Sequence, residues 1–290
     1  MNGVTTIDGP PPLVRGDLIA PGYRVVEHIS RGNSLDVYDV WSVERDCRCV
    51  AKVPRPDKLN EVKTRRRLST EGWLLQQLRH PHIVTCYDIL DDPHPAVILE
   101  TLQGHTLAYV LDEMTETLIL EETAWLGVQL CSAIGYLHTQ GWLHLDIKPA
   151  NIVSEFGQTK VIDLSVARRP GKGLSGIGTR EHMAPEQARG GELTTATDVY
   201  GIASVLYECL AGRVPFEDHL GENGEEYFPQ LELSAPSLGL HYDGPPDVVT
   251  LIDRALSDEP SNRPTLTELR NGLRDAAQID PEAPRERPAK

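Results

Sequence analysis

Hydrophobic positions in the first hundred residues follow a strand pattern that one helical interval interrupts. From Tyr23 to Val53, short runs rich in valine alternate with charged residues and turn formers, which is typical of β-strands. The segment "LSTEGWLLQQLRH" then changes to helical spacing, and "IVTCYDIL" and "AVILET" return to the strand pattern. This part of the chain is therefore predicted to form a small sheet with one main helix.

The pattern changes after Gly104. The segment "ETAWLGVQLCSAIGYLHTQG" predicts a long, largely buried helix that ends at a glycine, and the later segments read mostly as helix and loop. We find no internal repeat. The sequence thus predicts an α+β chain in two parts, 15–103 with the sheet and 104–278 with most helices, between unstructured segments at 1–14 and 279–290.

Composition narrows the classes of protein. The 290 residues include 28 Lys and Arg against 43 Asp and Glu, a net charge of −15 that argues against nucleic acid as a partner. No signal peptide is evident, and no apolar run reaches the roughly 18 residues of a membrane helix, so we expect a soluble, cytoplasmic protein. The five cysteines lack a paired C-x-x-C pattern and fit reduced thiols. Nothing in the sequence indicates a dimer.

Two polar residues stand close together in "HLDIKPAN". Asp146 and Asn151 are five residues apart, and Pro149 prevents a regular helix between them, so both oxygen ligands are expected on one tight loop. Asp163 ends the apolar strand in "KVIDLS", where a carboxylate is costly unless it meets a cation. Magnesium is the natural partner for these oxygens.

A lysine and a glutamate complete the set. Lys52 lies in the otherwise apolar strand "CVAKV", which can bury an ammonium only beside a carboxylate or phosphate, and Glu71 on the following helix can supply the carboxylate. Taken singly, each of these charges reads as an ordinary solvated residue. Their combination and order point to phosphoryl transfer.

The ordered set resembles the signature of protein kinases. From about Gly22 to Leu273 the chain resembles a bacterial, eukaryotic-like (Hanks-type) serine/threonine protein kinase. The supporting segments occur in that family's order: "LRHPHIVTCYDIL", "ILETLQGHTL", "YLHTQGWLHLDIKPANIV", "IGTREHMAPEQ", "TDVYGIASVLYECLAGRVPF" and "DEPSNRPT". The resemblance implies a bilobal protein-kinase fold, with ATP and Mg²⁺ (or Mn²⁺) as cofactors and proteins as substrates.

The resemblance also implies roles for single residues. Lys52 would bind the ATP phosphates, and Glu71 would hold Lys52 in place. Asp146 would accept the substrate's proton, and Lys148 would stabilise the γ-phosphate. Asn151 and Asp163 would bind metal. Lys148 with Thr179 marks serine/threonine specificity, Glu186 and Arg263 form a buried ion pair, and Asp198 supports the catalytic loop. The ATP-binding set implied is Ile29, Gly32, Val37, Val50, Lys52, Leu99, Glu100, Leu102 and Val153.

Three departures from the family pattern bear on function. The glycine-rich loop reads "SRGNSLDV", so Ser30 and Leu35 replace two glycines, which is expected to stiffen this lid. At residues 163–165 the sequence reads "DLS" where the family has D-F-G. Leu145 replaces the arginine that normally pairs with a phosphorylated activation loop, which predicts activity that does not depend on such phosphorylation.

Two alternatives remain from the sequence. One is a pseudokinase that acts as a regulatory scaffold through its lobes. The other is a kinase-like phosphotransferase for small molecules, against which "GTREHMAPEQ" and Arg263 speak, since in the family they build the groove for a polypeptide. Neither the protein substrate nor the upstream signal can be read from the sequence.

Overall fold

The computed structural model describes residues 9–91, 94–155, 157–219 and 227–279. The predicted unstructured segments 1–14 and 279–290 lie mostly outside these residues. The chain forms two compact units: one extends to Gly104 and includes Lys160–Ala167, and the other comprises His105–Thr159 and the chain from Arg168. The predicted lobe limits stay predictions, and the segment from Lys160 to Ala167 belongs with the sheet-containing unit.

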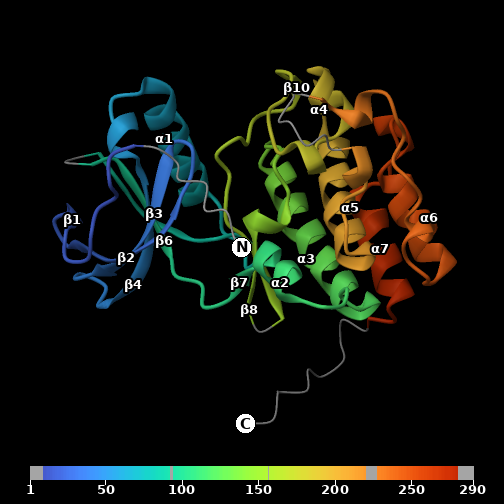
Figure 1. Cartoon of the computed structure of the whole chain (residues 1–290), viewed down its shortest axis with the longest axis horizontal. Coiled ribbons are helices and arrows are strands. Elements are labelled where there is room, and N and C mark those ends of the chain that lie inside the picture. The colour runs from blue at the N-terminus through green and yellow to red at the C-terminus, as the bar shows by residue number, and fades with distance from the viewer. Residues whose placement is uncertain (1–8, 92–93, 156, 220–226, 280–290) are drawn as a thin grey trace, which may run out of the picture. The chain divides into compact units, whose positions relative to one another are not determined.

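The first unit contains a six-stranded antiparallel sheet and one long helix (Figure 1). The strand order is β1-β2-β3-β4-β6-β5. The elements are β1 (Leu18–Ala20), β2 (Tyr23–Arg31), β3 (Leu35–Ser42), β4 (Cys47–Pro54), α1 (Val62–Gln77), β5 (Cys86–Leu90) and β6 (Ala96–Glu100), with a short 3-10 turn at Pro56–Lys58. The predicted small sheet with one main helix is therefore present.

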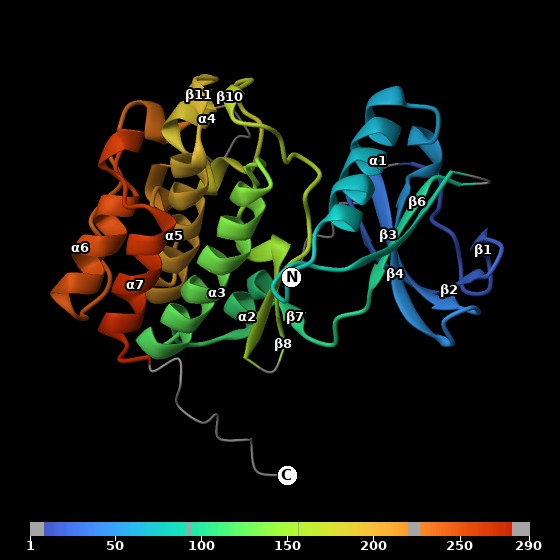
Figure 2. The same cartoon turned by 180° about the vertical axis from the view of Figure 1, so that it is seen from behind.

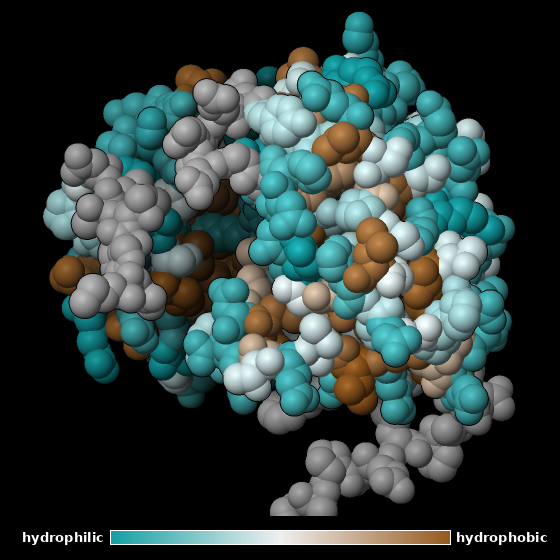
Figure 3. Space-filling view, turned by 45° about the vertical axis from the view of Figure 1, so that its right-hand side comes forward, coloured by the Kyte–Doolittle hydropathy of each residue, from teal (hydrophilic) through white to brown (hydrophobic). Residues whose placement is uncertain are grey.

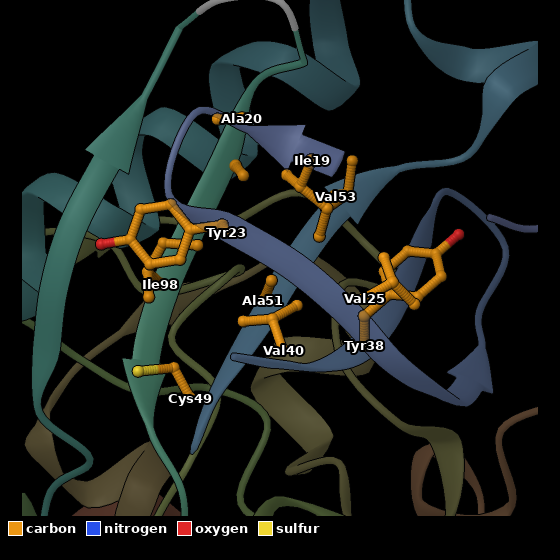
Figure 4. Packing of buried hydrophobic residues seen from close by; sticks show 11 residues of the cluster. Ile19, Ala20, Tyr23, Val25, Tyr38, Val40, Cys49, Ala51, Val53 and Ile98 are labelled. Carbon is orange, nitrogen blue, oxygen red and sulfur yellow. The ribbon is translucent and has the colours of Figure 1, made fainter. Parts of the chain in front are cut away.

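One face of this sheet carries a hydrophobic core cluster. Its members alternate along β2, β3, β4 and β6, as side chains on a single face of a sheet must, and β1 adds the adjacent residues Ile19 and Ala20. Figure 4 shows them gathered across the strands: Ile19, Ala20, Tyr23, Val25, Tyr38, Val40, Cys49, Ala51, Val53, Ala96 and Ile98. The valine-rich alternation in the sequence is thus the origin of this core.

Helix α1 packs against β4, β5 and β6. A Cβ on Gly72 would lie 2.7 Å from Cγ2 of Val97, so a glycine is needed where the helix meets β6. The helix begins at Val62, before the predicted segment, and ends when Leu78 adopts an extended backbone. This close packing places Glu71, the residue directly before Gly72, against the sheet.

The second unit is mostly helical. Its helices are α2 (Leu107–Glu113), α3 (Leu120–Thr139), α4 (Pro185–Arg189), α5 (Thr195–Ala211), α6 (Pro246–Ala255) and α7 (Leu266–Ala276). Short strands accompany them: β7 (His105–Thr106), β8 (Ile152–Glu155), β10 (Gly171–Lys172) and β11 (Glu192–Leu193). The boundary between the two units falls within β9 (Gln158–Val161), after Thr159. Single 3-10 turns occur at Pro149–Asn151, Arg180–His182, Glu217–His219, Pro229–Leu231, Leu238–Leu240 and Pro260–Asn262.

Three helices form the centre of the second unit. Helix α3 packs against α5 and α7, and the three lie side by side in Figures 1 and 2. A Cβ on Gly127 would lie 2.6 Å from Leu273 and 3.1 Å from Leu206, so this glycine permits the close approach. The long buried helix predicted from "ETAWLGVQLCSAIGYLHTQG" is α3, and Gly141 just beyond it has a positive φ of 77°.

One face of the molecule is shown by the hydropathy of its residues in Figure 3. In the view of Figure 3, hydrophobic side chains form small separate patches among hydrophilic ones. Within the described ranges, we find no helix with both the length and the apolar character needed to cross a membrane.

A buried ion pair joins α4 to the segment before α7. The Arg263 guanidinium donates to both carboxylate oxygens of Glu186, at 2.7 and 2.8 Å, and its side chain is 0% exposed. The same guanidinium lies 5.0 Å from the ring centre of Tyr200. The ion pair expected between Glu186 and Arg263 is thus confirmed.

Replacing Arg263 should destabilise this unit strongly. Arg263→Met leaves the Glu186 carboxylate buried without its partner, which typically costs about 3–5 kcal/mol. Urea denaturation of the wild type and the variant measures the loss. The control is Arg254→Met, because the Arg254 side chain is 47% exposed and its Nη2 lies 3.9 Å from Oε1 of Glu268. This control variant should lose less than about 1 kcal/mol of unfolding free energy. Similar losses for the two variants would contradict the importance of the buried pair.

Candidate functional site: a lysine-carboxylate centre and a catalytic loop

In the first unit, Lys52 on β4 lies between two carboxylates. Its Nζ donates to Oε1 of Glu71 at 2.6 Å and to Oδ2 of Asp163 at 3.1 Å. Glu71 comes from α1 and is fully buried, whereas the Asp163 side chain is 27% exposed. The sequence therefore folds so that strand, helix and the segment after β9 bring these three side chains together.

The charges of the three groups depend on each other. Burial disfavours the Lys52 ammonium, but Glu71 and Asp163 outweigh this effect and raise its pKa. Burial also opposes ionisation of Asp163, yet Lys52 and hydrogen bonds from Ser165 lower the pKa of its carboxyl. For Glu71, burial prevails over Lys52 and raises the pKa to about 7. Lys52 is thus held as a cation beside a carboxylate that stays ionised.

A cavity of about 270 Å³ opens beside this centre, and first-unit residues alone line it. Of the predicted site residues, Gly32, Val37, Lys52, Glu71 and Asp163 line the cavity. Hydrogen bonds from the N–H groups of Ser165 and Leu164 orient the two carboxylates, at 2.8 Å to Asp163 and 3.4 Å to Glu71. Cation, carboxylates and empty volume therefore occur at one place.

The β2–β3 hairpin forms one wall of the cavity. Gly32 closes its turn by donating to the carbonyl of Leu35 at 2.8 Å. Arg31 and Asp36 face each other across the hairpin, with Nε and Nη2 of Arg31 at 2.7 and 2.8 Å from the Asp36 carboxylate. Burial opposes the ionisation of Asp36, but Arg31 and His28 overcome it and lower the pKa. The hairpin is thus closed by an ion pair as well as by backbone bonds.

The remaining ATP-binding residues predicted in the first unit lie outside that cavity lining. Ile29 on β2 is exposed, Val50 is half-buried on β4, and Leu99 is buried on β6. Glu100 ends β6, and its side chain accepts hydrogen bonds from the N–H of Thr85 at 2.8 Å and from Lys160 at 2.5 Å. Leu102 follows two residues later and is half-buried. Their predicted contacts with a nucleotide stay predictions.

In the second unit, the loop between α3 and β8 carries a compact polar cluster. Oδ1 of Asp146 accepts from the Thr179 hydroxyl at 2.6 Å, and that hydroxyl accepts from Lys148 at 2.6 Å. Asn151 donates to Oδ2 of Asp146 at 3.0 Å and to its carbonyl at 2.9 Å. Val153 follows on β8, where it is buried and pairs with β7. Hydrogen bonds thus link four of the predicted residues: Asp146, Lys148, Asn151 and Thr179.

A buried carboxylate shapes this loop. Asp198 on α5 accepts from the N–H groups of His144 and Leu145, both at 2.8 Å, and from His138 at 2.7 Å. Leu145 has a φ of +67°, a left-handed conformation that is unfavourable for residues other than glycine. The expected support by Asp198 is confirmed, and its two bonds hold the unfavourable backbone that precedes Asp146.

Sequence reasoning missed three residues near these sites. Asp36 is a buried carboxylate in an alternating strand, and its charge opposite Arg31 at the hairpin ends was a usable signal. Arg67 on α1 lines the cavity beside Lys52. Gln187 donates its amide to backbone carbonyls, including that of Leu145 at 2.6 Å. No sequence pattern reveals such a bond, because every residue has a carbonyl.

The fold and both clusters define a class of protein. A strand lysine bonded to a helical glutamate and to an aspartate, with a His-x-Asp-x-x-x-x-Asn loop bonded to a threonine, is the arrangement of phosphoryl transferases of the kinase type. Residues 23–272 match the protein kinase domain. The chain belongs to the protein kinase family, whose members generally use ATP and Mg²⁺.

Two bacterial serine/threonine kinases illustrate the similarity to known proteins. The chain is 29% identical over 267 residues to the probable serine/threonine-protein kinase PknB of Lactococcus lactis, covering 87% of this chain and 41% of the relative. It is 30% identical over 260 residues to the serine/threonine-protein kinase PrkC of Bacillus subtilis, and this match covers 87% of this chain and 40% of PrkC. This chain thus spans about two fifths of the length of these relatives.

Structural comparison supports the same fold. The crystal structure of the Mycobacterium tuberculosis PknI kinase domain matches with a TM-score of 0.72 and 23% identity, covering 91% of this chain and 100% of that one. The predicted α+β protein-kinase fold is therefore confirmed.

Loss of the Lys52 ammonium should make stability depend on pH through Glu71. Burial already raises the pKa of Glu71 to about 7, and Lys52→Met should raise it further. A carboxyl whose pKa is higher in the folded state stabilises the fold fully below its unfolded pKa, and loses that contribution as pH rises toward the folded pKa. The free energy of unfolding of Lys52→Met should fall by about 1.4 kcal/mol per pH unit between about pH 5 and pH 7.

Urea denaturation at several pH values measures this slope. Other groups titrate in the same range, so the reference is the double variant Lys52→Met/Glu71→Gln, which keeps the side-chain size and cannot titrate at this position. The double variant should show a flatter profile. Parallel profiles for the two variants would show that Glu71 does not respond to Lys52.

Proposed function

We propose that this chain is an active serine/threonine protein kinase that transfers the γ-phosphate of ATP to serine or threonine hydroxyls of protein substrates. The observation that carries this proposal is the Lys52 ammonium, held at 2.6 Å from Glu71 and 3.1 Å from Asp163 beside a cavity. A buried ion pair is weak support for stability, so its position at an open cavity favours a binding role.

The charge of this cavity suits a nucleotide with a metal ion. The lining holds two cations, Lys52 and Arg67, against two carboxylates, Glu71 and Asp163, so it has no excess positive charge to attract a polyphosphate that comes without a cation. Mg²⁺ is commonly bound by one or two carboxylates together with substrate phosphates, and the partly exposed Asp163 offers such an oxygen. Bound Mg²⁺ would neutralise charge on the phosphates, with Asp163 and Asn151 as its protein ligands. Lys52 would orient the α- and β-phosphates, and Glu71 would hold Lys52.

The catalytic loop contains the groups that protein phosphorylation requires. Asp146 would orient the substrate hydroxyl and accept its proton, and it already accepts a hydrogen bond from the threonine hydroxyl of Thr179. Lys148, whose Nζ is 2.6 Å from the same hydroxyl, would stabilise charge that develops on the transferred phosphate. This combination of lysine and threonine favours serine/threonine substrates.

The activation segment, which runs from Asp163 to Glu186, is proposed to work without phosphorylation. Leu145 offers no charge where the family has an arginine. Other bonds hold the segment: Ser175 donates to the carbonyl of Ala188 at 2.5 Å, and β10 pairs with β11. The nearby arginines have backbone partners, since Arg168 donates to Lys172 at 2.8 Å and Arg169 donates to Gln140 at 2.7 Å.

The altered glycine-rich loop is proposed to bind ATP as a preformed lid. Ser30 and Leu35 occupy strand positions, paired with Val37 and Pro54 respectively, and the Arg31–Asp36 ion pair closes the hairpin. A lid fixed in this way has less freedom to close over phosphates than a glycine-rich one. Lys52 and the metal would then provide most of the charge neutralisation.

Kinase activity should be measurable with a generic substrate. Purified protein, labelled ATP, Mg²⁺ and a generic basic protein should give label incorporation by the wild type. Asp163→Asn and Asp146→Asn should lower it by about 10²-fold or more, because each removes a charged group from the reaction. Asp39→Asn is the control, since Asp39 forms an ion pair with Arg48 elsewhere in the sheet. Equal incorporation by the wild type and Asp163→Asn would refute the enzyme proposal in favour of a pseudokinase scaffold.

Dephosphorylation should leave the activity unchanged. A phosphate on Ser175 or Thr179 finds no arginine beside Asp146, and on Thr179 it would repel the Asp146 carboxylate. The initial rate should therefore agree within about twofold before and after complete phosphatase treatment, with removal verified by mass spectrometry. A loss of about tenfold, or 1.4 kcal/mol in the barrier, would mean that a phosphate does order this enzyme.

A further inference from the structure

A buried glutamine connects two segments of the second unit that are far apart in sequence. Gln187, in helix α4, is 3% exposed. Its Nε2 donates to the carbonyl of Leu145 at 2.6 Å and also to the carbonyl of Ile177. Leu145 precedes the proposed catalytic base, Asp146, and Ile177 lies in the activation segment. One side-chain amide therefore joins the catalytic loop to the activation segment.

The chemistry of this bridge is specific to an amide. Both facing groups are carbonyl oxygens, which only accept hydrogen bonds, so the bridging group must supply two N–H donors. A neutral –NH₂ group does so without bringing a charge into a buried site. A hydroxyl has a single donor, and a carboxylate has none. Glutamine also has the length that its place in α4 requires.

The bridge also bears on the unfavourable backbone of Leu145. Its N–H is bound by Asp198 at 2.8 Å, and its C=O is bound by Gln187. With a φ of +67°, this residue needs outside support, and the two bonds hold both of its polar backbone groups. The orientation of the next peptide, which carries Asp146, depends on this support.

Gly178 completes the arrangement. A Cβ on Gly178 would lie 2.5 Å from Nε2 of Gln187 and 2.7 Å from the Leu145 carbonyl, so only glycine leaves room for the amide. The next residue is Thr179, whose hydroxyl bonds to Asp146 at 2.6 Å. The amide thus lies between the two segments that form the polar cluster.

We infer that Gln187 is a positioning residue that joins the catalytic loop to the activation segment by neutral hydrogen bonds, in the role that an arginine and a phosphate would otherwise share. This inference rests on the proposed kinase function and explains how an activation segment beside Leu145 is ordered without modification. Gln187 acts through Leu145 and Ile177 and does not itself contact substrate.

Gln187→Met tests the inference, because it keeps the approximate volume and removes both donors. The matched control is Gln129→Met: Gln129 is also buried in this unit, and its amide bonds to Gly157 at 2.9 Å and to Thr159 at 2.7 Å, away from the activation segment. Gln187→Met should lower kcat by about tenfold or more, with KM for ATP within about twofold of the wild type. Gln129→Met should keep kcat within about twofold, and both should lower the melting temperature to a similar degree.

A charge-changing variant separates positioning from simple stability. In Gln187→Glu the buried carboxylate faces two carbonyls and regains one donor only when protonated, so its activity relative to the wild type should be higher at about pH 6 than at about pH 8. A ratio that does not change with pH, or equal kcat losses in Gln187→Met and Gln129→Met, would overturn the inference.

Hydrogen exchange decides the inference even if no activity is found. Backbone amides of residues 176–182 should exchange faster in Gln187→Met than in Gln129→Met or the wild type, and phosphatase treatment should not alter the difference. Unchanged exchange in Gln187→Met would overturn the bridge. An inactive wild type with faster exchange in Gln187→Met would retain the bridge and refute only the kinase proposal.

Discussion

The buried carboxylate of Asp198 is the contact on which the catalytic loop depends. It accepts hydrogen bonds from the backbone N–H groups of His144 and Leu145 and a third hydrogen bond from the His138 ring. Without these charge-assisted bonds, a leucine at a φ of +67° would relax to a more common conformation. Since Asp146 follows directly, the direction of its carboxylate is set by a residue of helix α5 that is distant in sequence. The conformation of the catalytic loop therefore depends on a side chain of the helical core.

Each unit buries a charged pair, and the two pairs differ in their surroundings. Arg263 and Glu186 are enclosed, and their hydrogen bonds connect parts of the helical unit. Lys52 and Glu71 instead lie beside a cavity, with the partly exposed Asp163 next to them. Burying charge costs desolvation, and apolar side chains would often serve stability as well. A buried lysine at a cavity is thus best explained by a ligand that carries negative charge.

Besides the bonds of Thr179 to Lys148 and Asp146, two neutral glutamine side chains hold the activation segment. Amide donors from Gln187 reach the carbonyls of Leu145 and Ile177, and a second glutamine, Gln230, donates to the carbonyls of Arg180 and Met183, both at 3.1 Å. Such bonds form on folding and do not wait for a modification. A phosphate held by arginine can be added and removed, whereas a glutamine amide cannot. The proposed activity without phosphorylation rests on this difference in bonding group.

The sequence by itself determined the fold class and the order of the elements, and it predicted which polar residues would act at the site. Alternating valines specify the sheet face, and polar residues such as Lys52, Asp146 and Asp163 stand out because they interrupt apolar segments that would otherwise exclude them. The family resemblance implied that Asp198 supports the catalytic loop, but only the tertiary structure decided the other contacts that hold the loops. Asp36 and Gln187 find their partners through chain folding, and a backbone carbonyl such as that of Leu145 leaves no mark in a sequence, because every residue carries one.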